Sequence, residues 1–504
     1  MSIPKICGIE TEYGILVRGA GESNPISASS MLINAYLAAL ESGRGSHRTQ
    51  RVGWNFDDES PGNDAREETM LLSLAPEVET HLVNAVLTNG ARYYVDHAHP
   101  EYSCPEAPDA HTALVADRAG EEILIRSMAA AARVMDDGQE IVVYKNNSDG
   151  KGNSYGCHEN YLVDRGVPFG RIVAHATPHL VSRQIFTGSG KIGSEAPGLS
   201  TAEVPFQITQ RADFFEEEVG LETTLKRPII NTRDEPHADA QKYRRLHVIT
   251  GDANMSEVQT FLKLGTTSLV LAMIEDDVLG EPLKLARPVP AMHQVSMDLS
   301  LSETLEMADG TRRTALDLQW ELFGKARDYA DTRGLEALGP ESVGDAVMSR
   351  WESVLSGLDA DPMTLADQLD WVAKYRLYQA YRERDDMEWS DPRLAAMDLQ
   401  YHDMRPGRCL ARKLGLERLT TDDEVEVATY EPPSGTRAYF RGTCLARFAP
   451  EIVAANWDSL VFDTGAPSLR RVPMLEPSKG TQEHVGALIA EATSASDLLD
   501  RLGR

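Results

Sequence analysis

The alternation of apolar and polar residues predicts strands in the first half of the chain and helices in much of the second. Extended patterns occur at residues 4–14, 91–95, 141–145, 157–163, 204–211 and 244–252. Helical periodicity predicts helices at 28–42, from the N-cap Asp117 to Gly138, from Asn254 or Ser256 to Ile274, and over most of 313–420. Strands interrupted by helices, with an antiparallel character, predict an α+β fold.

Two stretches interrupt this pattern. Residues 43–77 are polar and weakly periodic, which is typical of a functional or disordered segment, although Trp54 and Phe56 indicate that part of it docks. The Pro/Gly-bearing break TYEPPSGTR near residue 430 separates the last 70 or so residues. We therefore expect a catalytic domain at 1–430, with an insertion at 43–77, and a small domain at 431–504.

Composition narrows the class of protein. The 504 residues are 42% hydrophobic and 25% charged, as in ordinary globular proteins. The sequence contains no apolar run long enough for a membrane span and begins without a signal-peptide pattern. Five scattered cysteines without a CxxC pair suit a reducing cytoplasm. The net charge of −28 disfavours nucleic acids and anionic membranes as partners.

A cluster of acids and imidazoles directly follows the strand-like sequence ARYYV. It contains Asp96, His97, His99, Glu101 and Glu106. Buried charges must be paired or bound to a metal, so the cluster suits hard cations with an acid or base beside them. A solvated loop is the alternative interpretation.

A second pair of carboxylates weakens that alternative. Glu10 and Glu12 are two residues apart in the extended sequence GIETEYG, so they share one face of a strand. Like charges on one face repel unless a cation lies between them. His158 and Asn160 share a strand face in the same way, and a neutral His158 can donate a nitrogen to a metal.

The acidic composition means that a bound nucleotide would need a local positive pocket. Residues 226–257 supply clustered arginines, and Arg245 and His247 would share a strand face. Further basic candidates are Arg211, Arg437 and Arg441. Since the sequence has no Walker or GxGxxG motif, a nucleotide would bind through Mg²⁺ and arginines. These residues fit phosphoryl or amide chemistry at a carboxylate, without identifying a substrate.

Five long motifs resemble the Pup ligase and Pup deamidase/depupylase family, which is related to glutamine synthetase. They are GIETEYG (8–14), TNGARYYVDHAHPEY (88–102), KNNSDGKGNSYGCHENYL (145–162), residues 227–257 and TRAYFRG (436–442). The resemblance implies a glutamine-synthetase-like curved antiparallel sheet that forms an active-site cradle backed by helices. It also implies ATP and Mg²⁺ as cofactors.

The resemblance further implies an activity and partners. Residues 54–66 and the sequence VDHAHPEY resemble the deamidase branch, which converts the C-terminal Gln of the ubiquitin-like protein Pup to Glu and hydrolyses Pup–lysine isopeptide bonds. The partners would be Pup and pupylated proteins, with an indirect link to the bacterial proteasome pathway. The alternatives are a Pup–protein ligase that consumes ATP and an inactive ATP-binding protein that sequesters Pup.

Site residues follow from the resemblance position by position. Asp96 matches the catalytic aspartate, as nucleophile or general base. Metal-ligand positions match Glu10, Tyr94 and Glu101, with Glu12 and His158 as additions. ATP-contacting positions match Arg92 and Trp457, and Arg211, Arg245 and His247 are further candidates. Cys104 stands where the ligase has a nucleotide-contacting threonine.

Overall fold

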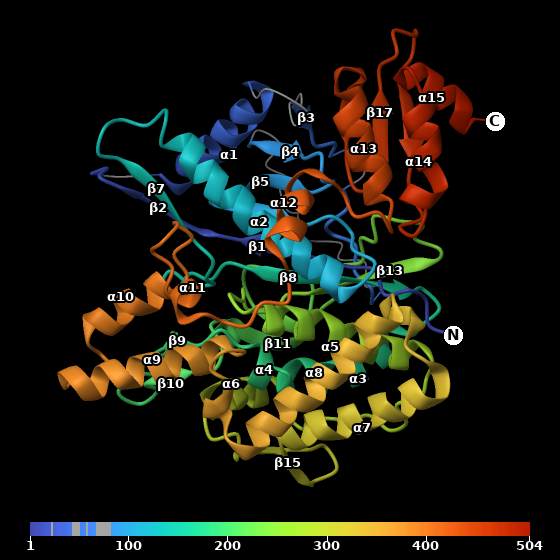
Figure 1. Cartoon of the computed structure of the whole chain (residues 1–504). Helices are drawn as coiled ribbons and strands as arrows, with labels where there is room; N and C mark the ends of the chain where they lie inside the picture. Colours follow the sequence, from blue (N-terminus) through green and yellow to red (C-terminus); the bar gives the residue numbers. More distant parts are fainter. Residues whose placement is uncertain (22–23, 43–50, 57–58, 67–81, 504) are drawn as a thin grey trace.

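The computed structural model describes residues 1–21, 24–42, 51–56, 59–66 and 82–503. Its centre is a seven-stranded sheet in the order β13-β8-β1-β6-β5-β4-β3, and every neighbouring pair is antiparallel (Figure 1). The strands are β1 (Cys7–Glu12), β3 (Val52–Gly53), β4 (Asn84–Val86), β5 (Arg92–Asp96), β6 (His99–Ser103), β8 (Cys157–Asp164) and β13 (Tyr243–Val248). The expected α+β fold with an antiparallel sheet is confirmed.

Helices cover one face of this sheet. Helices α1 (Pro25–Ser42) and α2 (Ala110–Ala131) pack against the buried sides of β1, β5 and β6 in one apolar core. A second core surrounds α5 (Glu257–Glu275). Its N-cap is Ser256, which is one of the two predicted starting residues. The opposite face of the sheet is left for polar side chains.

The predicted start of α2 was wrong. Asp109, not Asp117, caps the helix, since its carboxylate accepts a hydrogen bond from Thr112 N at 2.8 Å. Asp117 is buried inside the helix and pairs with Lys145 at 2.6 Å. The helix also ends before Gly138, at Ala131.

The rest of the chain before α13 (Ala438–Phe448) adds short sheets and many helices (Figure 1). The short strands pair as β2 (Gly14–Arg18) with β7 (Glu140–Tyr144), β9 (Lys191–Ile192) with β10 (Phe206–Gln207), β11 (Phe215–Gly220) with β12 (Arg227–Asn231), and β14 (Thr304–Glu306) with β15 (Arg312–Thr314). The helices are α3 (Phe169–Ser182), α4 (Gln184–Thr187), α6 (Pro288–Met297), α7 (Ala315–Arg333), α8 (Glu341–Ala360), α9 (Asp370–Asp385), α10 (Pro392–Tyr401), α11 (Leu410–Leu414) and α12 (Asp422–Tyr430). The mainly helical stretch at 313–420 is confirmed, whereas the strand predicted at 204–211 reduces to two residues.

The last part of the chain has its own three-stranded sheet, at the upper right of Figure 1. It consists of α13 (Ala438–Phe448), β16 (Ile452–Ala455), β17 (Ser459–Phe462), β18 (Arg470–Pro473), α14 (Gln482–Glu491) and α15 (Ala495–Leu502). Its apolar core also contains Val52 of β3, Trp54, which directly follows β3, and Val86 of β4. The docking expected for Trp54 is therefore observed. The described parts of the 43–77 insertion are 51–56 and 59–66, and the rest lies outside the described residues.

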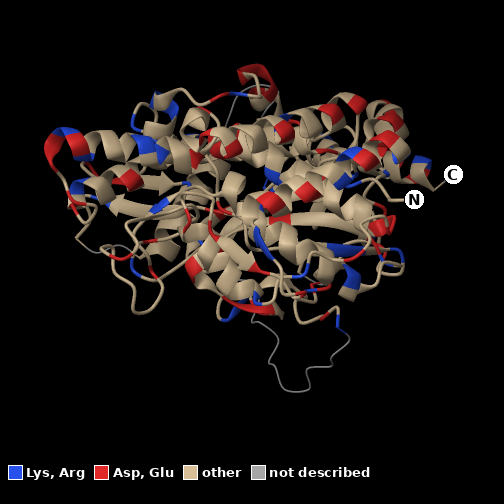
Figure 2. Cartoon of the chain, turned by 90° about the horizontal axis from the view of Figure 1, so that it is seen from below, with Lys and Arg blue, Asp and Glu red and all other residues tan. Residues whose placement is uncertain are grey.

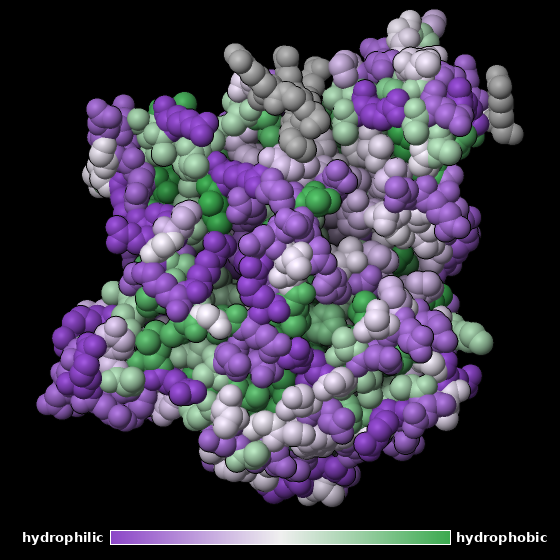
Figure 3. Space-filling view, viewed as in Figure 1, coloured by the Kyte–Doolittle hydropathy of each residue, from purple (hydrophilic) through white to green (hydrophobic). Residues whose placement is uncertain are grey.

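The surface reflects the acidic composition. Acidic side chains are spread over helices and loops with basic ones between them (Figure 2), and hydrophilic residues cover most of the face in Figure 3. Among the described residues, none of the helices has both the length and the apolar character needed to cross a bilayer. All five cysteines are buried and free.

Candidate active site

The β5–β6 hairpin carries the acidic cluster that the sequence singled out. Along β5, Arg92, Tyr94 and Asp96 are half-buried and alternate with fully buried residues, so these three side chains share one face. Across the turn Asp96 pairs with His99, and His97 has a φ of 51°, in the left-handed region. Asp96 therefore lies at the very end of a strand, beside a tight turn.

The register of β1 brings distant carboxylates together. Glu12 lies opposite Glu101 of β6, and Glu10 lies between Ser103 of β6 and His158 of β8. Glu10 and Glu12 occupy the half-buried positions of β1, as its alternating sequence predicted. The two glutamates and the hairpin acids are thus brought together on one face of the sheet.

The first potential ligand group consists of three carboxylates. Oxygens of Glu12, Asp96 and Glu101 lie within 4.8 Å of one another. Glu101 is only 2% exposed, and burial together with the charge of Asp96 raises its pKa well above the usual value. Tyr94 donates a hydrogen bond to Glu101 at 2.5 Å. Three acids so close together fit a bound cation, which would remove their mutual repulsion.

Gly156 fixes the position of Glu12. Its N–H donates to Glu12 Oε1 at 2.9 Å, and a Cβ there would lie 2.7 Å from that oxygen and 2.2 Å from His158 Nε2. Burial opposes ionisation of Glu12, but bonding to His99 and the charge of His158 outweigh it and lower the pKa to about 2. Glu12 is therefore held as a carboxylate.

The second potential ligand group combines one carboxylate with two imidazoles. Ligand atoms of Glu10, His158 and His247 lie within 4.8 Å of one another. His247 Nδ1 lies 2.9 Å from Asn160 Oδ1, an acceptor, so Nδ1 carries the proton and Nε2 keeps its lone pair. Burial and the neighbouring Arg245 lower the pKa of His247 well below its usual value. A neutral imidazole is the form that binds a metal.

The two groups differ in the ions that they favour. Three carboxylates offer oxygen ligands, which Mg²⁺ prefers. Two imidazoles with one carboxylate also suit transition metals such as Mn²⁺ and Zn²⁺. The glutamates and the histidine that were expected as ligands therefore fit divalent cations. Tyr94, which was also expected as a ligand, is hydrogen-bonded to one of these glutamates, Glu101.

A large polar cavity of about 520 Å³ joins both groups to arginines. Its lining includes Arg92, Arg233, Arg245, His237 and Trp457. A smaller pocket with mostly apolar walls adjoins it and shares Glu10, Ser103, His237, Arg245 and Trp457 with it; Ile9, Cys104 and Leu162 also line this pocket. The guanidine Nε of Arg233 is buried without a hydrogen-bond partner. An apolar pocket beside a group of arginines fits a nucleotide: the pocket suits the base and the arginines suit the phosphates.

Aromatic residues of the insertion and the C-terminal unit form one wall of the cavity. The guanidinium of Arg92 lies 4.1 Å from the ring centre of Trp54 and 3.9 Å from that of Tyr94. Trp54 packs edge-on against Trp457 at 5.2 Å. Two residues expected to contact the nucleotide, Arg92 and Trp457, are thus linked through a residue of the insertion.

Glu106 does not belong to the acidic cluster, contrary to its place in the sequence pattern. It accepts a hydrogen bond from Arg437 Nε at 2.7 Å and pairs with Arg441. Burial would raise the pKa of Glu106, but the two arginines lower it to about 2. Arg437 and Arg441 are therefore committed to an internal ion pair, and they add no free charge for a phosphate.

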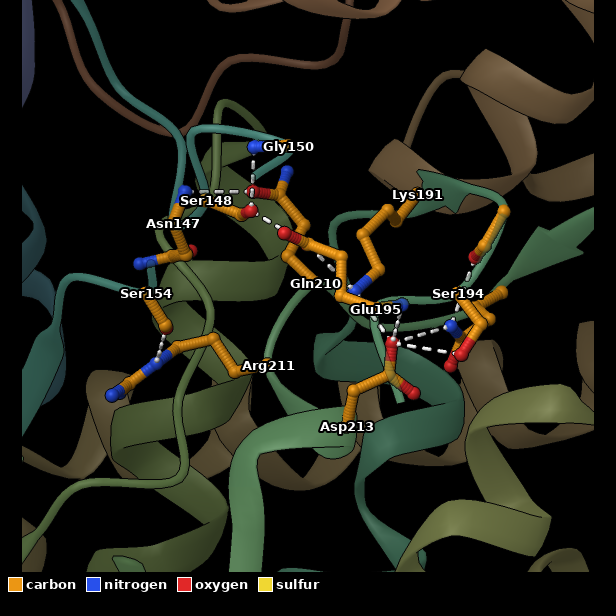
Figure 4. Close-up of polar contacts among 12 residues, drawn as sticks. Asn147, Ser148, Gly150, Ser154, Lys191, Ser194, Glu195, Gln210, Arg211 and Asp213 are labelled. Atoms are coloured by element: carbon orange, nitrogen blue, oxygen red, sulfur yellow. Dashed lines mark hydrogen bonds and ion pairs between the residues drawn. The ribbon is translucent and has the colours of Figure 1, made fainter. Parts of the chain in front are cut away.

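Two other arginines lie away from the large cavity: the candidate Arg211, and Arg244 from the basic stretch at 226–257. Arg211 is 1% exposed, donates to Ser154 Oγ at 3.3 Å and to the carbonyl of Ile249, and does not line either cavity (Figure 4). Arg244 points to the other face of β13 and donates to Val167 O at 3.0 Å. Arg245 and His247 do share the cavity face, as predicted.

Sequence reasoning missed His237 and Gly156. His237 lines both cavities with a φ of 46°, and burial with four nearby arginines lowers its pKa well below the usual value. A single histidine in a polar stretch gives no recognisable signal. The role of Gly156 depends on contacts with Glu12 and His158, which no local pattern shows.

Comparisons with known proteins place the chain in a family. A family model described as Pup-ligase protein matches residues 5–461. The chain therefore belongs to the Pup ligase family, which includes the Pup deamidases/depupylases.

Individual relatives give a finer view. The chain is 50% identical to the depupylase of Acidothermus cellulolyticus and 48% identical to the Pup deamidase/depupylase of Mycolicibacterium smegmatis, each over 99% of both chains. It is 41% identical to the Pup–protein ligase of Actinosynnema mirum, over 81% of this chain and 90% of that protein.

Solved structures of the ligase branch share the fold. The complex between Pup and its ligase PafA aligns with a TM-score of 0.79 at 31% identity, over 99% of this chain and 94% of that one. PafA in complex with ADP aligns with a TM-score of 0.73 at 36% identity, over 81% of this chain and 89% of that one.

Proposed function

We propose that this protein is a Pup deamidase and depupylase. It would hydrolyse the side-chain amide of the C-terminal Gln of Pup, and the isopeptide bond between Pup and a lysine of a pupylated protein. Two relatives that match it over nearly their whole length are named depupylase and Pup deamidase/depupylase. Mg²⁺ and ATP would be bound cofactors, and Asp96 the nucleophile or general base.

The observation that carries the proposal is the exposure of Asp96. Within the group of three carboxylates, the side chain of Asp96 is 35% exposed, whereas that of Glu12 is 12% exposed and Glu101 is 2% exposed. Only Asp96 of this group is open enough to reach a substrate. The other two suit the holding of a cation.

The reaction can be followed through the residues of the chain. His97 Nδ1 lies 2.9 Å from Asp96 Oδ2, which orients the carboxylate and leaves Oδ1 for the substrate. Oδ1 either attacks the amide carbon or takes a proton from a water that attacks it. If a water attacks, the proton that Asp96 takes from it passes to the leaving ammonia or lysine amine as the C–N bond breaks. If Asp96 attacks, the leaving nitrogen takes its proton from solvent, and a water molecule then hydrolyses the anhydride between Asp96 and Pup to free both carboxyl groups.

The cofactors fit the residues already described. A divalent cation, when bound, would stabilise the negative charge that develops on the amide oxygen. Glu12 and Glu101 would hold one such ion beside Asp96, and Glu10, His158 and His247 would hold another. Arg92, Arg233 and Arg245 would bind phosphate oxygens, with Trp457 beside the base. Hydrolysis of an amide releases free energy, so ATP need not be consumed in each turnover.

The decisive experiment is incubation with Gln-ended Pup, Mg²⁺ and ATP, read by mass spectrometry. We expect the mass change of a carboxamide that becomes a carboxylic acid. Asp96→Asn should abolish turnover while nucleotide affinity stays within about twofold, because Asn keeps the shape and loses the charge. Asp137→Asn, on an exposed turn, is the matched control. Near-normal turnover by Asp96→Asn would exclude the assigned role.

The ligase remains the second candidate, because solved ligases share this fold over most of the chain. A ligase must consume ATP with each bond that it forms. ADP release measured against amide cleavage separates the two activities: a hydrolase cleaves many amides for each ADP released.

A further inference from the structure

Asn160 connects side chains that the proposed function assigns to a cation and to phosphate. It belongs to β8, which runs between β1 and β13 in the central sheet (Figure 1). In the register of this sheet it is paired with Gly8 on one side and with His247 on the other. It lines the smaller pocket together with Glu10 and Arg245.

The side-chain amide of Asn160 is hydrogen-bonded at both of its ends. Its Nδ2 donates to Glu10 Oε1 at 2.8 Å. Its Oδ1 accepts from Arg245 Nη1 at 2.9 Å and lies 2.9 Å from His247 Nδ1. A carbonyl oxygen has two lone pairs, so it can accept both of these bonds.

Charged neighbours fix the orientation of this amide. A guanidinium group only donates hydrogen bonds, so Arg245 requires the amide oxygen. A carboxylate only accepts them, so Glu10 requires the amide nitrogen. In the reverse orientation the NH₂ group would face Arg245 and the oxygen would face Glu10, and both bonds would be lost. Arg245 is itself held from elsewhere, because its Nε donates to Glu235 O at 2.8 Å.

The amide oxygen in turn selects the tautomer of His247. A neutral imidazole carries its proton on one ring nitrogen, and the other nitrogen is the one that can bind a metal. Because the amide oxygen only accepts, the proton of His247 lies on Nδ1. Nε2 then keeps its lone pair for the group that His247 forms with Glu10 and His158. Metal-binding histidines are generally oriented by an acceptor behind the ring in this way.

We propose that Asn160 is a positioning residue, which sets the tautomer of His247 and the orientation of Glu10 for the binding of one divalent cation. The inference rests on the cation site of the proposed function. Asn160 acts through these two neighbours and needs no contact with the ion or the substrate.

The tautomer is measured directly in the full-length protein without metal. Nitrogen NMR of isotope-labelled histidines separates protonated from unprotonated ring nitrogens, and the spectrum of His247→Gln identifies the signals of His247. At pH 8 an ordinary histidine, with a pKa of about 6.5, is neutral. We expect His247 to be in the Nδ1–H form in the wild type. Asn160→Ala should lose the dominance of this form, whereas Asn160→Asp should keep it, because a carboxylate also accepts.

Cation affinity is the second measurement. The affinity for one Mn²⁺ ion, followed by electron paramagnetic resonance, should fall about 10- to 100-fold in Asn160→Ala, the usual effect of losing the support behind a metal ligand. Asn34→Ala, on the exposed face of α1, is the matched control and should keep both the tautomer and the affinity. Buried His402 serves as an internal reference, and its unchanged signals would show that each variant is folded.

The inference would be overturned by a wild type whose His247 carries the proton on Nε2. It would also be overturned if Asn160→Ala kept the wild-type tautomer or the wild-type Mn²⁺ affinity. Loss of the tautomer in Asn160→Asp as well as in Asn160→Ala would reject the role of the accepting oxygen, which a merely structural contact does not need.

Failure of the proposed function would look different. A wild type with the Nδ1–H form of His247 and bound Mn²⁺ that cleaves no amide of Pup would refute the hydrolase and leave the role of Asn160 standing. A wild type that cleaves the amide while His247 carries its proton on Nε2 would do the reverse.

Discussion

Replacing Gly156 with alanine should disable the active site by displacing two ligands at once. Gly156 has no positive φ, so the effect comes from space alone. The new Cβ would lie 2.2 Å from His158 Nε2 and 2.7 Å from Glu12 Oε1, whereas ordinary contact begins at 3.4 Å. His158 must therefore move by about 1 Å, which is more than the roughly 0.5 Å that a preorganised site tolerates.

The displacement has a measurable size. Disturbed support of metal ligands typically lowers metal affinity about 10- to 100-fold, and a misplacement of 1 Å in an active site costs about 100-fold in rate. Mn²⁺ binding is followed by electron paramagnetic resonance, and deamidation of Pup is followed by mass. Both should fall together in Gly156→Ala.

Gly324→Ala is the matched control, because Gly324 lies in helix α7 with no atom within 4 Å of the added Cβ. It should leave both measurements unchanged and stabilise the helix by about 1 kcal/mol. If Gly156→Ala bound Mn²⁺ and turned over like the wild type while folded, the placement of Glu12 and His158 as ligands would be refuted.

Two further substitutions test buried carboxylates, one in the active site and one pair in the core. Glu101→Gln should stabilise the metal-free protein at pH 8: the raised pKa makes ionised Glu101 unfavourable in the folded state, so the difference in unfolding free energy should vanish towards pH 4. The same variant should bind divalent cations at least about tenfold more weakly, and a metal-free protein that gains no stability at pH 8 would contradict the carboxylate repulsion. Lys145→Met should cost about 3–5 kcal/mol in urea unfolding, because it leaves the buried carboxylates of Asp117 and Glu121 without their common cation. Exposed Lys284→Met should cost little, and equal losses in both lysine variants would disprove the importance of the buried network.

Local sequence predicted the parts of the site that depend on alternation. The strand period of two places Glu10 with Glu12, His158 with Asn160, and Arg245 with His247, and each pair shares a face in the structure.

Local sequence misled where two residues compete for one role. Asp109 and Asp117 are both suitable N-caps, and the helix begins at the earlier one, since Ala113 and Leu114 pack into the core and extend it. Glu106 is close to Asp96 in the chain, yet its partner arginines come from α13 and the residue before it, more than 300 residues later. Composition and spacing cannot rank partners at that distance.

By itself, the sequence determined the α+β class, the faces of the strands and the family. Only the tertiary structure decided that Glu12 lies opposite Glu101, that Gly156 supports Glu12, and that Arg211 lies outside the large cavity. The physical reason is that alternation is a property of one strand, whereas register and burial depend on which strands pair. Charges that are independent along the chain acquire their roles only when pairing sets the distances between them.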